Sequence, residues 1–118
     1  DTIDSVSGLE GSKIEMAWVQ TRNLEIEMFQ YHSHPTELPA EPRPVDAVGY
    51  NMIMFDVSNI EAARERVLGA GGTIVSDLGL MDGGDVLFAR DPDGNLLGLQ
   101  KLPEGSVFSA ANFPDNGT

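Results

Sequence analysis

The feature that most constrains the fold of this chain is a change of hydrophobic period at Ser58. Residues 50–57 form a largely apolar run rich in strand-forming side chains. Ser58 and Glu61 then have the spacing of a capping box, in which a hydroxyl and a carboxylate each satisfy a free backbone donor at a helix start. The pattern therefore predicts a strand followed at once by a helix that begins at Ser58.

The helix predicted after Ser58 is amphipathic. Apolar side chains recur at helical spacing on one face and charged side chains fall largely on the other. The apolar set is Ile60, Ala63, Val67 and Leu68, and the charged set is Glu61, Arg64, Glu65 and Arg66. Gly71 and Gly72 end the helix, because glycine tolerates the left-handed conformation that closes it. A helix of this kind lies with one face on a sheet.

Three further strands are predicted downstream of the helix, at residues 73–76, 85–90 and 96–102. A turn at residues 82–84 joins the first two. The sequence Asp91-Pro92-Asp93-Gly94-Asn95 joins the last two, because proline sets one backbone dihedral and glycine supplies a positive φ. Residues 45–102 are therefore expected to form one complete βαβββ module.

A second, shorter copy of this pattern precedes the complete module. Residues 13–20 and 24–31 are predicted to form a hairpin like the closing hairpin of the module, so residues 1–34 represent a partial first module. Residues 1–12 are polar and interrupted by glycine, and they supply neither its opening strand nor its helix. We expect either a fragment of a longer product or a half-site that another chain completes. The open strand edges favour a homodimer.

Two segments are expected to lie outside the modules. Residues 35–44 contain four prolines, which make an extended, semi-rigid connector between the two copies. Residues 103–118 form a C-terminal tail with Val107, Phe108 and Phe113 among polar residues. This tail either covers an exposed edge or lacks order.

The order and spacing of these segments resemble the vicinal oxygen chelate superfamily, which includes glyoxalases, extradiol dioxygenases, epimerases and bleomycin resistance proteins. The matching segments are residues 26–31, 49–57, 62–72 and 91–100. The resemblance implies an α+β fold in which βαβββ modules form a curved mixed sheet around a cleft, here with the first module incomplete at its N-terminal part.

The resemblance also implies where a metal would be held. In this family the first and last strands of each module commonly provide histidine and carboxylate ligands to the cleft. It places Glu27 at a carboxylate position of the first module, Met52 at the histidine position of the second, and Gly98 at its carboxylate position. A thioether is a soft ligand and glycine has no side chain, so neither suits a hard divalent cation. A register shift of one residue would bring Asn51 into the cleft in place of Met52.

Six side chains are the candidate ligand contacts of the cleft: Trp18, Glu27, Phe29, Tyr31, Met52 and Met54. In a purely structural alternative, three glutamates form the solvated face of a hairpin, and the other face of the hairpin belongs to the core. The glutamates are Glu15, Glu25 and Glu27, and the core face would be Ile14, Met16, Trp18, Ile26 and Met28. The two histidines, His32 and His34, would face one way if their strand continued to Pro35, but solvated loop histidines are the preferred interpretation.

Composition excludes several classes of partner and chemistry. The absence of cysteine removes disulfides and thiolate catalysis. The net charge of -12 repels phosphate, so nucleic acid is not expected as a partner, and it favours a cationic or amphipathic ligand. No apolar run approaches the length of a membrane span, so no membrane partner is expected and a cytoplasmic location is predicted.

The function predicted from these residues is a small-molecule binding protein that sequesters its ligand, without a catalytic metal or other cofactor. The alternative is a metal-dependent lyase, isomerase or dioxygenase, with zinc, manganese, nickel or iron held by Glu27 and by ligands from a missing segment or a neighbouring chain. A third possibility is a structural role in which Met52 and Met54 fill a collapsed cavity. The loss of both ligands at Met52 and Gly98 favours the first.

Overall fold

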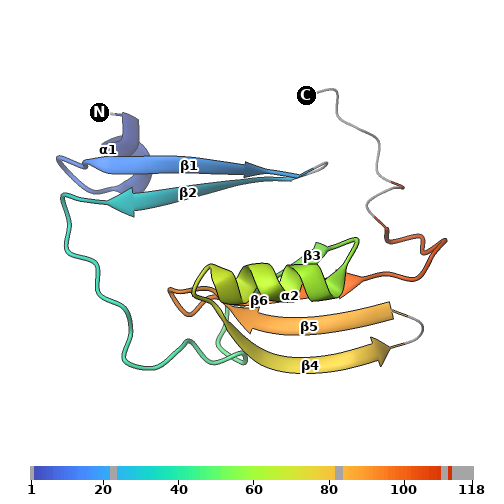
Figure 1. Cartoon of the computed structure of the whole chain (residues 1–118). Coiled ribbons are helices and arrows are strands. Elements are labelled where there is room, and N and C mark those ends of the chain that lie inside the picture. Colours follow the sequence, from blue (N-terminus) through green and yellow to red (C-terminus); the bar gives the residue numbers. More distant parts are fainter. Residues whose placement is uncertain (1, 22–23, 82–83, 110–111, 113–118) are drawn as a thin grey trace. The chain divides into compact units, whose positions relative to one another are not determined.

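The computed structural model describes residues 2–21, 24–81, 84–109 and 112. The chain divides between Leu38 and Pro39 into two compact units, each of which is described by itself. The first, here called the hairpin unit, contains α1 (Thr2–Ser7), β1 (Ile14–Gln20) and β2 (Glu25–Tyr31). The second, the sheet unit, contains β3 (Met52–Asp56), α2 (Ile60–Gly69), β4 (Thr73–Met81), β5 (Gly84–Arg90) and β6 (Leu96–Lys101) (Figure 1).

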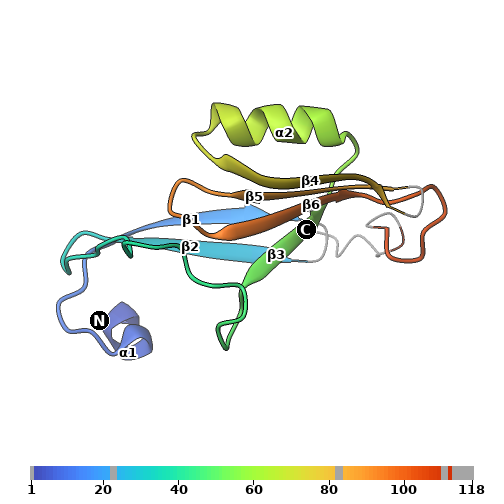
Figure 2. The same cartoon turned by 90° about the horizontal axis from the view of Figure 1, so that it is seen from below.

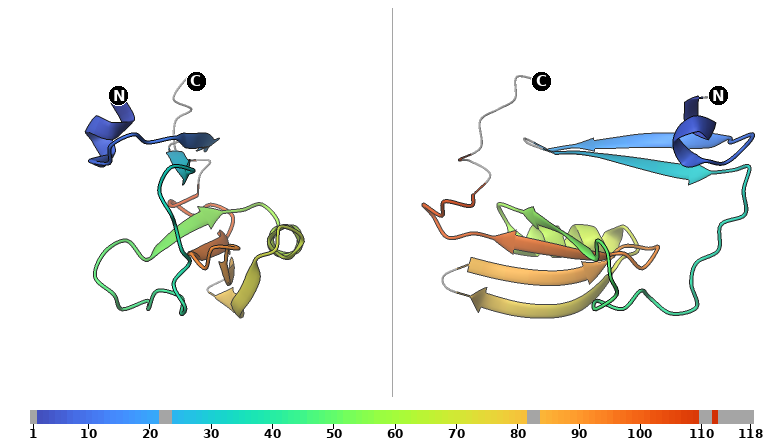
Figure 3. Two further views of the ribbon diagram at one scale, coloured as in Figure 1. Left: turned by 90° about the vertical axis from the view of Figure 1, so that its left-hand side faces the viewer. Right: turned by 180° about the vertical axis from the view of Figure 1, so that it is seen from behind.

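The sheet unit is one four-stranded sheet in the order β3-β6-β5-β4, with β3 parallel to β6 and the other pairs antiparallel. The helix α2 lies along one face of this sheet (Figure 2), and the end-on view in Figure 3 shows the same arrangement. The chain order strand, helix, three strands confirms the βαβββ module predicted from the sequence, within an α+β fold.

The core of the sheet unit lies between α2 and the two central strands. Leu87, Ala89 and Leu99 are at most 8% exposed, and they come from adjacent positions of β5 and β6. Burying apolar side chains of this kind is the main favourable contribution to folding. On α2, Ala63 and Val67 are half-buried, but Leu68, which the periodicity placed on the same face, is 42% exposed.

The predicted start of the helix was wrong by one residue. Asn59, and not Ser58, is the N-cap: its side-chain oxygen accepts a hydrogen bond from the Ala62 N–H at 2.9 Å. The reason lies in the preceding strand. The Val57 N–H donates to the Gln100 carbonyl at 2.7 Å, so the chain stays in the ladder up to Val57 and needs two more residues to turn into the helix.

Two strands differ in length from their predicted bounds. The strand β4 runs to Met81, well beyond the predicted residues 73–76, and accommodates two register shifts in its pairing with β5. The strand β3 begins at Met52 and not at residue 50, because the preceding residues form a loop closed by side chains. Arg43 donates to the carbonyls of Val48 and Tyr50 in this loop.

The predicted turn at residues 91–95 is present. One carboxylate oxygen of Asp91 accepts hydrogen bonds from the backbone N–H groups of Asp93 and Asn95, at 3.0 and 2.8 Å. Gly94 has a φ of 89°, which a side chain would strain. The aspartate therefore acts as a turn residue, as expected. Residues 82 and 83 of the other predicted turn lie outside the described residues.

The hairpin unit contains one element that the sequence pattern did not predict, the six-residue helix α1. Asp4 connects it to the strand that follows, because its carboxylate accepts hydrogen bonds from the backbone N–H groups of Gly11 and Ser12. The bond from Ser12 lowers the pKa of Asp4 from its ordinary value. The two strands of the unit pair in regular antiparallel register over their whole length. Within the described part of the chain, no helix is both long and apolar enough to cross a membrane.

Candidate functional site

The candidate site of the sheet unit is the face of the sheet that points away from α2. Gly98 is buried there beneath Met52 and Met54, which are 41% and 37% exposed. A Cβ atom added at Gly98 would overlap the Sδ of Met54, and it would lie 2.6 Å from Met54 Cε and 3.3 Å from Met52 Sδ. Two thioether groups therefore occupy the space over the position where the family resemblance expects a carboxylate.

Strand register explains why these two methionines share a face. Met54 lies opposite Gly98 and Met52 opposite Leu96 in the parallel pairing of β3 with β6. Side chains alternate along a strand, so Ile53 and Phe55 point to the other face, and Phe55 lines a pocket there together with residues of α2. The shift of one residue that would bring Asn51 onto the face of Met52 is not adopted.

Asn51 does not contact the candidate site but makes hydrogen bonds to the loop that precedes β3. Its side-chain amide donates hydrogen bonds to the carbonyls of Val45 and Ala47, at 2.8 and 2.7 Å. Its own Oδ1 is buried and accepts no hydrogen bond from the described residues. Asn51 thus helps to hold the loop at residues 43–51 in place at the start of β3.

The residues of this face do not fit the divalent metal that the resemblance implies. The ligand positions hold a thioether and a glycine covered by thioethers, and hard cations prefer oxygen and imidazole ligands. Across the described residues, no three histidine, aspartate or glutamate side chains come together closely enough to hold a metal ion. The role of Met52 and Met54 as ligand contacts stays a prediction.

The register of the hairpin unit places the other candidate residues on one face. Trp18 lies opposite Glu27, Met16 opposite Phe29 and Ile14 opposite Tyr31, and directly paired residues of antiparallel strands share a face. The rings of Phe29 and Tyr31 are 6.5 Å apart. Aromatic side chains and a carboxylate thus line the same side of the hairpin.

This register contradicts the purely structural alternative for the hairpin, in which one face holds the glutamates and the other face is core. That alternative grouped Trp18 with Ile26 and Met28 on a core face, opposite the glutamates. In the structure, Ile26 and Met28 share their face with Val19 and Ala17, which lie directly opposite them in the pairing. The alternative fails because residues with the same parity on the two strands of this hairpin point to opposite faces.

The two hairpins of the chain can be compared through the residue pairs that close their turns. Gln20 pairs with Glu25 in the hairpin unit, and Arg90 pairs with Leu96 in the sheet unit. Glu27 and Gly98 each lie two residues beyond the second member of the closing pair. Observed register therefore supports the sequence alignment of Glu27 with Gly98. The part of Glu27 in binding stays a prediction.

The two histidines lie in separate interactions. The strand β2 ends at Tyr31, so the condition under which both would face one way is not met. His32 Nε2 lies 3.5 Å from a carboxylate oxygen of Glu15. His34 Nδ1 lies 2.8 Å from the hydroxyl oxygen of Ser33, and the His34 ring meets the ring of Tyr31 edge-on. The pair does not converge on one point.

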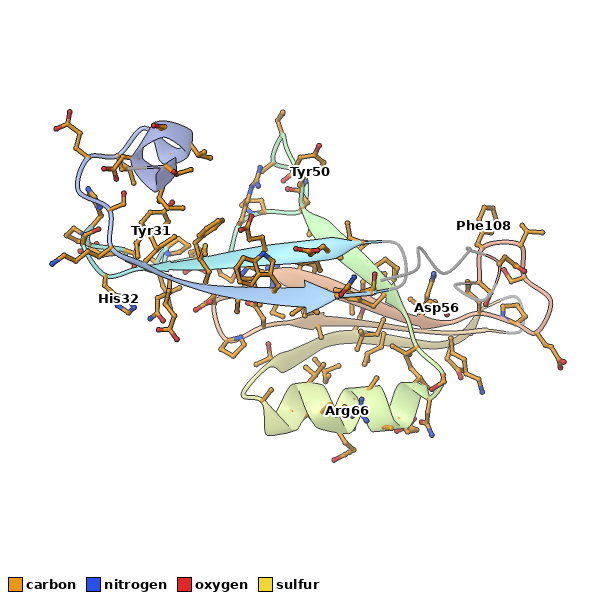
Figure 4. All side chains as sticks on the ribbon, turned by 90° about the horizontal axis from the view of Figure 1, so that it is seen from above. Tyr31, His32, Tyr50, Asp56, Arg66 and Phe108 are labelled. Atoms are coloured by element: carbon orange, nitrogen blue, oxygen red, sulfur yellow. The ribbon has the colours of Figure 1, made fainter. Side chains whose placement is uncertain are left out.

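A pocket of about 380 Å³ that the sequence did not indicate opens on the helix side of the sheet unit. Phe55, Val67 and Leu99 give it apolar walls, and Asp56 and Arg66 lie at its polar part. Figure 4 shows Asp56 on β3 and Arg66 on α2. Sequence reasoning missed it because the space arises where α2 crosses the sheet, which local periodicity does not reveal.

Comparison with known proteins assigns this fold to a family. A family model described as the glyoxalase/bleomycin resistance protein/dioxygenase superfamily matches residues 2–99. The chain belongs to this superfamily. The match spans both units, so it includes the hairpin and the sheet module together.

Two solved structures of similar fold accompany this superfamily match. A glyoxalase family protein from Bacillus cereus is 26% identical, with a TM-score of 0.73, over 85% of this chain and 69% of its own. The protein SMU.1112c is 20% identical, with a TM-score of 0.54, over 85% of this chain and 87% of its own, and this likeness concerns the fold alone. No protein with a curated description matches significantly.

Proposed function

We propose that this superfamily member is a small-molecule binding protein that sequesters its ligand and works without a catalytic metal. The observation that carries the proposal is the geometry at Gly98, where the thioethers of Met52 and Met54 occupy the position of a ligand side chain. Thioethers are polarisable and pack against irregular apolar ligands, whereas they hold hard cations poorly. Such a face suits binding better than metal-assisted catalysis.

The proposed ligand is a cationic, partly aromatic molecule. Trp18 and Glu27 lie opposite each other on the hairpin, and Phe29 and Tyr31 share their face. Aromatic faces attract cations through their quadrupole, and a nearby carboxylate adds a direct charge interaction. The chain's net charge of -12 raises the local concentration of cations further.

Fluorescence titration tests the ligand class, because Trp18 is the one tryptophan of the chain and reports directly on the hairpin face. The probes are ethidium, a cationic aromatic dye, and anilinonaphthalene sulfonate, an anionic aromatic dye. We expect ethidium to bind more tightly and to change Trp18 emission. Glu27→Gln should weaken ethidium binding by about tenfold, corresponding to about 1.4 kcal/mol. Glu15→Gln is the matched control, because it makes the same charge change on the opposite face of the hairpin.

Calorimetric titration with zinc, manganese, nickel and iron(II) tests the absence of a catalytic metal. We expect no stoichiometric binding. One metal ion bound per chain at micromolar strength, and lost in Glu27→Gln, would contradict the proposal and favour a metal-dependent enzyme. Equal affinity for the two dyes would contradict the assignment of a cationic ligand.

A further inference from the structure

The two histidines after β2 lie beside different faces of the hairpin, and the proposed function uses neither of them. His32 Nε2 is 3.5 Å from a carboxylate oxygen of Glu15. The ring of His34 lies against the ring of Tyr31, with centroids 6.5 Å apart and planes at 81°. Figure 4 shows Tyr31 and His32 where β2 ends. Since Tyr31 pairs with Ile14, which precedes Glu15 on β1, Tyr31 and Glu15 point to opposite faces.

His34 continues a row of aromatic rings along the proposed binding face. The ring of Tyr31 lies 6.5 Å from that of Phe29 and also 6.5 Å from that of His34. Separations of this size are usual for favourable aromatic contacts. Both Tyr31 and His34 are half-buried, whereas His32 is exposed. His34 therefore belongs with the aromatic side chains that would meet a ligand.

Hydrogen bonds to β1 fasten the segment that contains His34. The His32 N–H donates to the Lys13 carbonyl at 2.8 Å, and the Lys13 N–H donates to the Ser33 hydroxyl oxygen at 2.9 Å. The same hydroxyl oxygen lies 2.8 Å from His34 Nδ1. The hydroxyl can donate its proton to Nδ1 of a neutral imidazole, or its second lone pair can accept a bond from a protonated one. The ring can therefore keep its place in both charge states.

We propose that His34 is a specificity-determining residue of the binding face, whose neutral ring accepts a cationic ligand beside Tyr31 and whose protonated ring repels it. The inference rests on the proposed function, because it concerns the cationic ligand of that same face. A histidine side chain ordinarily changes its charge between about pH 5 and 8. A neutral imidazole adds aromatic surface to the row, while an imidazolium places a like charge next to the ligand. Affinity for a cation should therefore fall as the pH falls.

The other charged groups around His34 do not produce this change. Carboxyl groups such as those of Glu15 and Glu27 ordinarily stay ionised above about pH 5, and a lysine ammonium or a tyrosine hydroxyl keeps its proton up to about pH 10. Among the side chains of the chain, the two histidines are thus the ones that ordinarily titrate in this range. His32 has its carboxylate partner on the opposite face, so its protonation should affect the ligand much less.

Fluorescence titration of ethidium at about pH 7.5 and pH 5.5 tests the proposal, because its quaternary nitrogen keeps a positive charge at both. We expect the wild type to bind ethidium about fivefold more weakly at the lower pH. His34→Phe keeps a ring beside Tyr31 but cannot titrate, so it should bind equally at both pH values. His32→Gln is the matched control, because it removes the neighbouring histidine and should keep the full pH dependence.

Two further readouts separate a charge effect from a loss of structure. Affinity for the anionic dye anilinonaphthalene sulfonate should not fall at the lower pH. In the protein without ligand, the Tyr31 ring signals in nuclear magnetic resonance spectra should shift as His34 titrates, and this shift should be absent in His34→Phe.

Several outcomes would overturn the proposal. Ethidium affinity that does not change with pH in the wild type would overturn this inference and leave the proposed function standing. A pH dependence that persists in His34→Phe, or disappears in His32→Gln, would assign the effect to another group. Absence of ethidium binding at both pH values would contradict this inference and the proposed function together.

Discussion

At the scale of single residues, Gly72 and Gly98 both lack room for a side chain, but their neighbours differ in kind. A Cβ at Gly72 would lie 2.7 Å from the Arg90 carbonyl oxygen and 3.1 Å from that of Val67. The Gly72 N–H also donates to the Val67 carbonyl at 2.9 Å, which holds this backbone in place. At Gly98 the obstructing atoms are the ends of two flexible methionine side chains.

This difference predicts unequal costs for the same substitution. Gly72→Ala should lower the free energy of unfolding by about 1–3 kcal/mol, because rigid backbone atoms must move. Gly98→Ala should lower it by less than about 1 kcal/mol, because the ends of the methionines can rotate away. Urea unfolding of the two variants measures both values. A cost at Gly98 equal to that at Gly72 would mean that the methionines are held rigidly over the glycine.

The sequence predicted which residue types occupy the candidate site, since Met52 and Gly98 lie at the positions where the family resemblance expects ligands. It did not predict which atoms fill the space over Gly98. The Sδ of Met54 reaches that point only because β3 and β6 pair in one particular register. Residues 54 and 98 are too far apart in the chain for any local pattern to set their contact.

At the scale of elements, the start of α2 shows the limit of a capping motif. Ser58 and Asn59 are both good N-cap residues, because either side chain can accept a hydrogen bond from the backbone N–H three residues further along the chain. The strand β3 decides between them, because the bond from Val57 to Gln100 keeps the chain extended to that point. Asn59 therefore takes the cap, with extended backbone angles of φ -144° and ψ 110°.

A pair of substitutions distinguishes the two capping residues. Asn59→Ala should lower the free energy of unfolding by about 1 kcal/mol, because the Ala62 N–H loses its acceptor. Ser58→Ala, the adjacent matched change, should cost no more than a few tenths of a kcal/mol, as is usual for surface substitutions. Thermal unfolding followed by circular dichroism measures both. A larger loss of stability for Ser58→Ala than for Asn59→Ala would contradict this assignment and favour the capping box that the sequence predicts.

At the scale of the whole molecule, the two units bury their side chains to different degrees. The central strands of the sheet unit contain Leu87, Ala89 and Leu99, all at most 8% exposed. In the hairpin unit, no described residue of β1 or β2 is buried. A two-stranded hairpin taken by itself gains little from apolar burial.

Hydrogen exchange should therefore separate the units. We expect the amides of β5 and β6 to exchange slowly, with protection close to that of global unfolding, and the amides of β1 and β2 to exchange sooner. Exchange measured residue by residue by nuclear magnetic resonance tests this on the whole chain. Equal protection in the hairpin would show that its faces are covered in solution, by the other unit or by another molecule.

The sequence by itself determined the order of the strands and of α2, the turn at residues 91–95 and the βαβββ module, because hydrophobic period and turn chemistry are local properties of the chain. Only the tertiary structure decided which residue caps α2, which residues share a face of the hairpin, and which sulfur covers Gly98. These features follow from strand register, and register depends on pairing between segments that are distant in sequence.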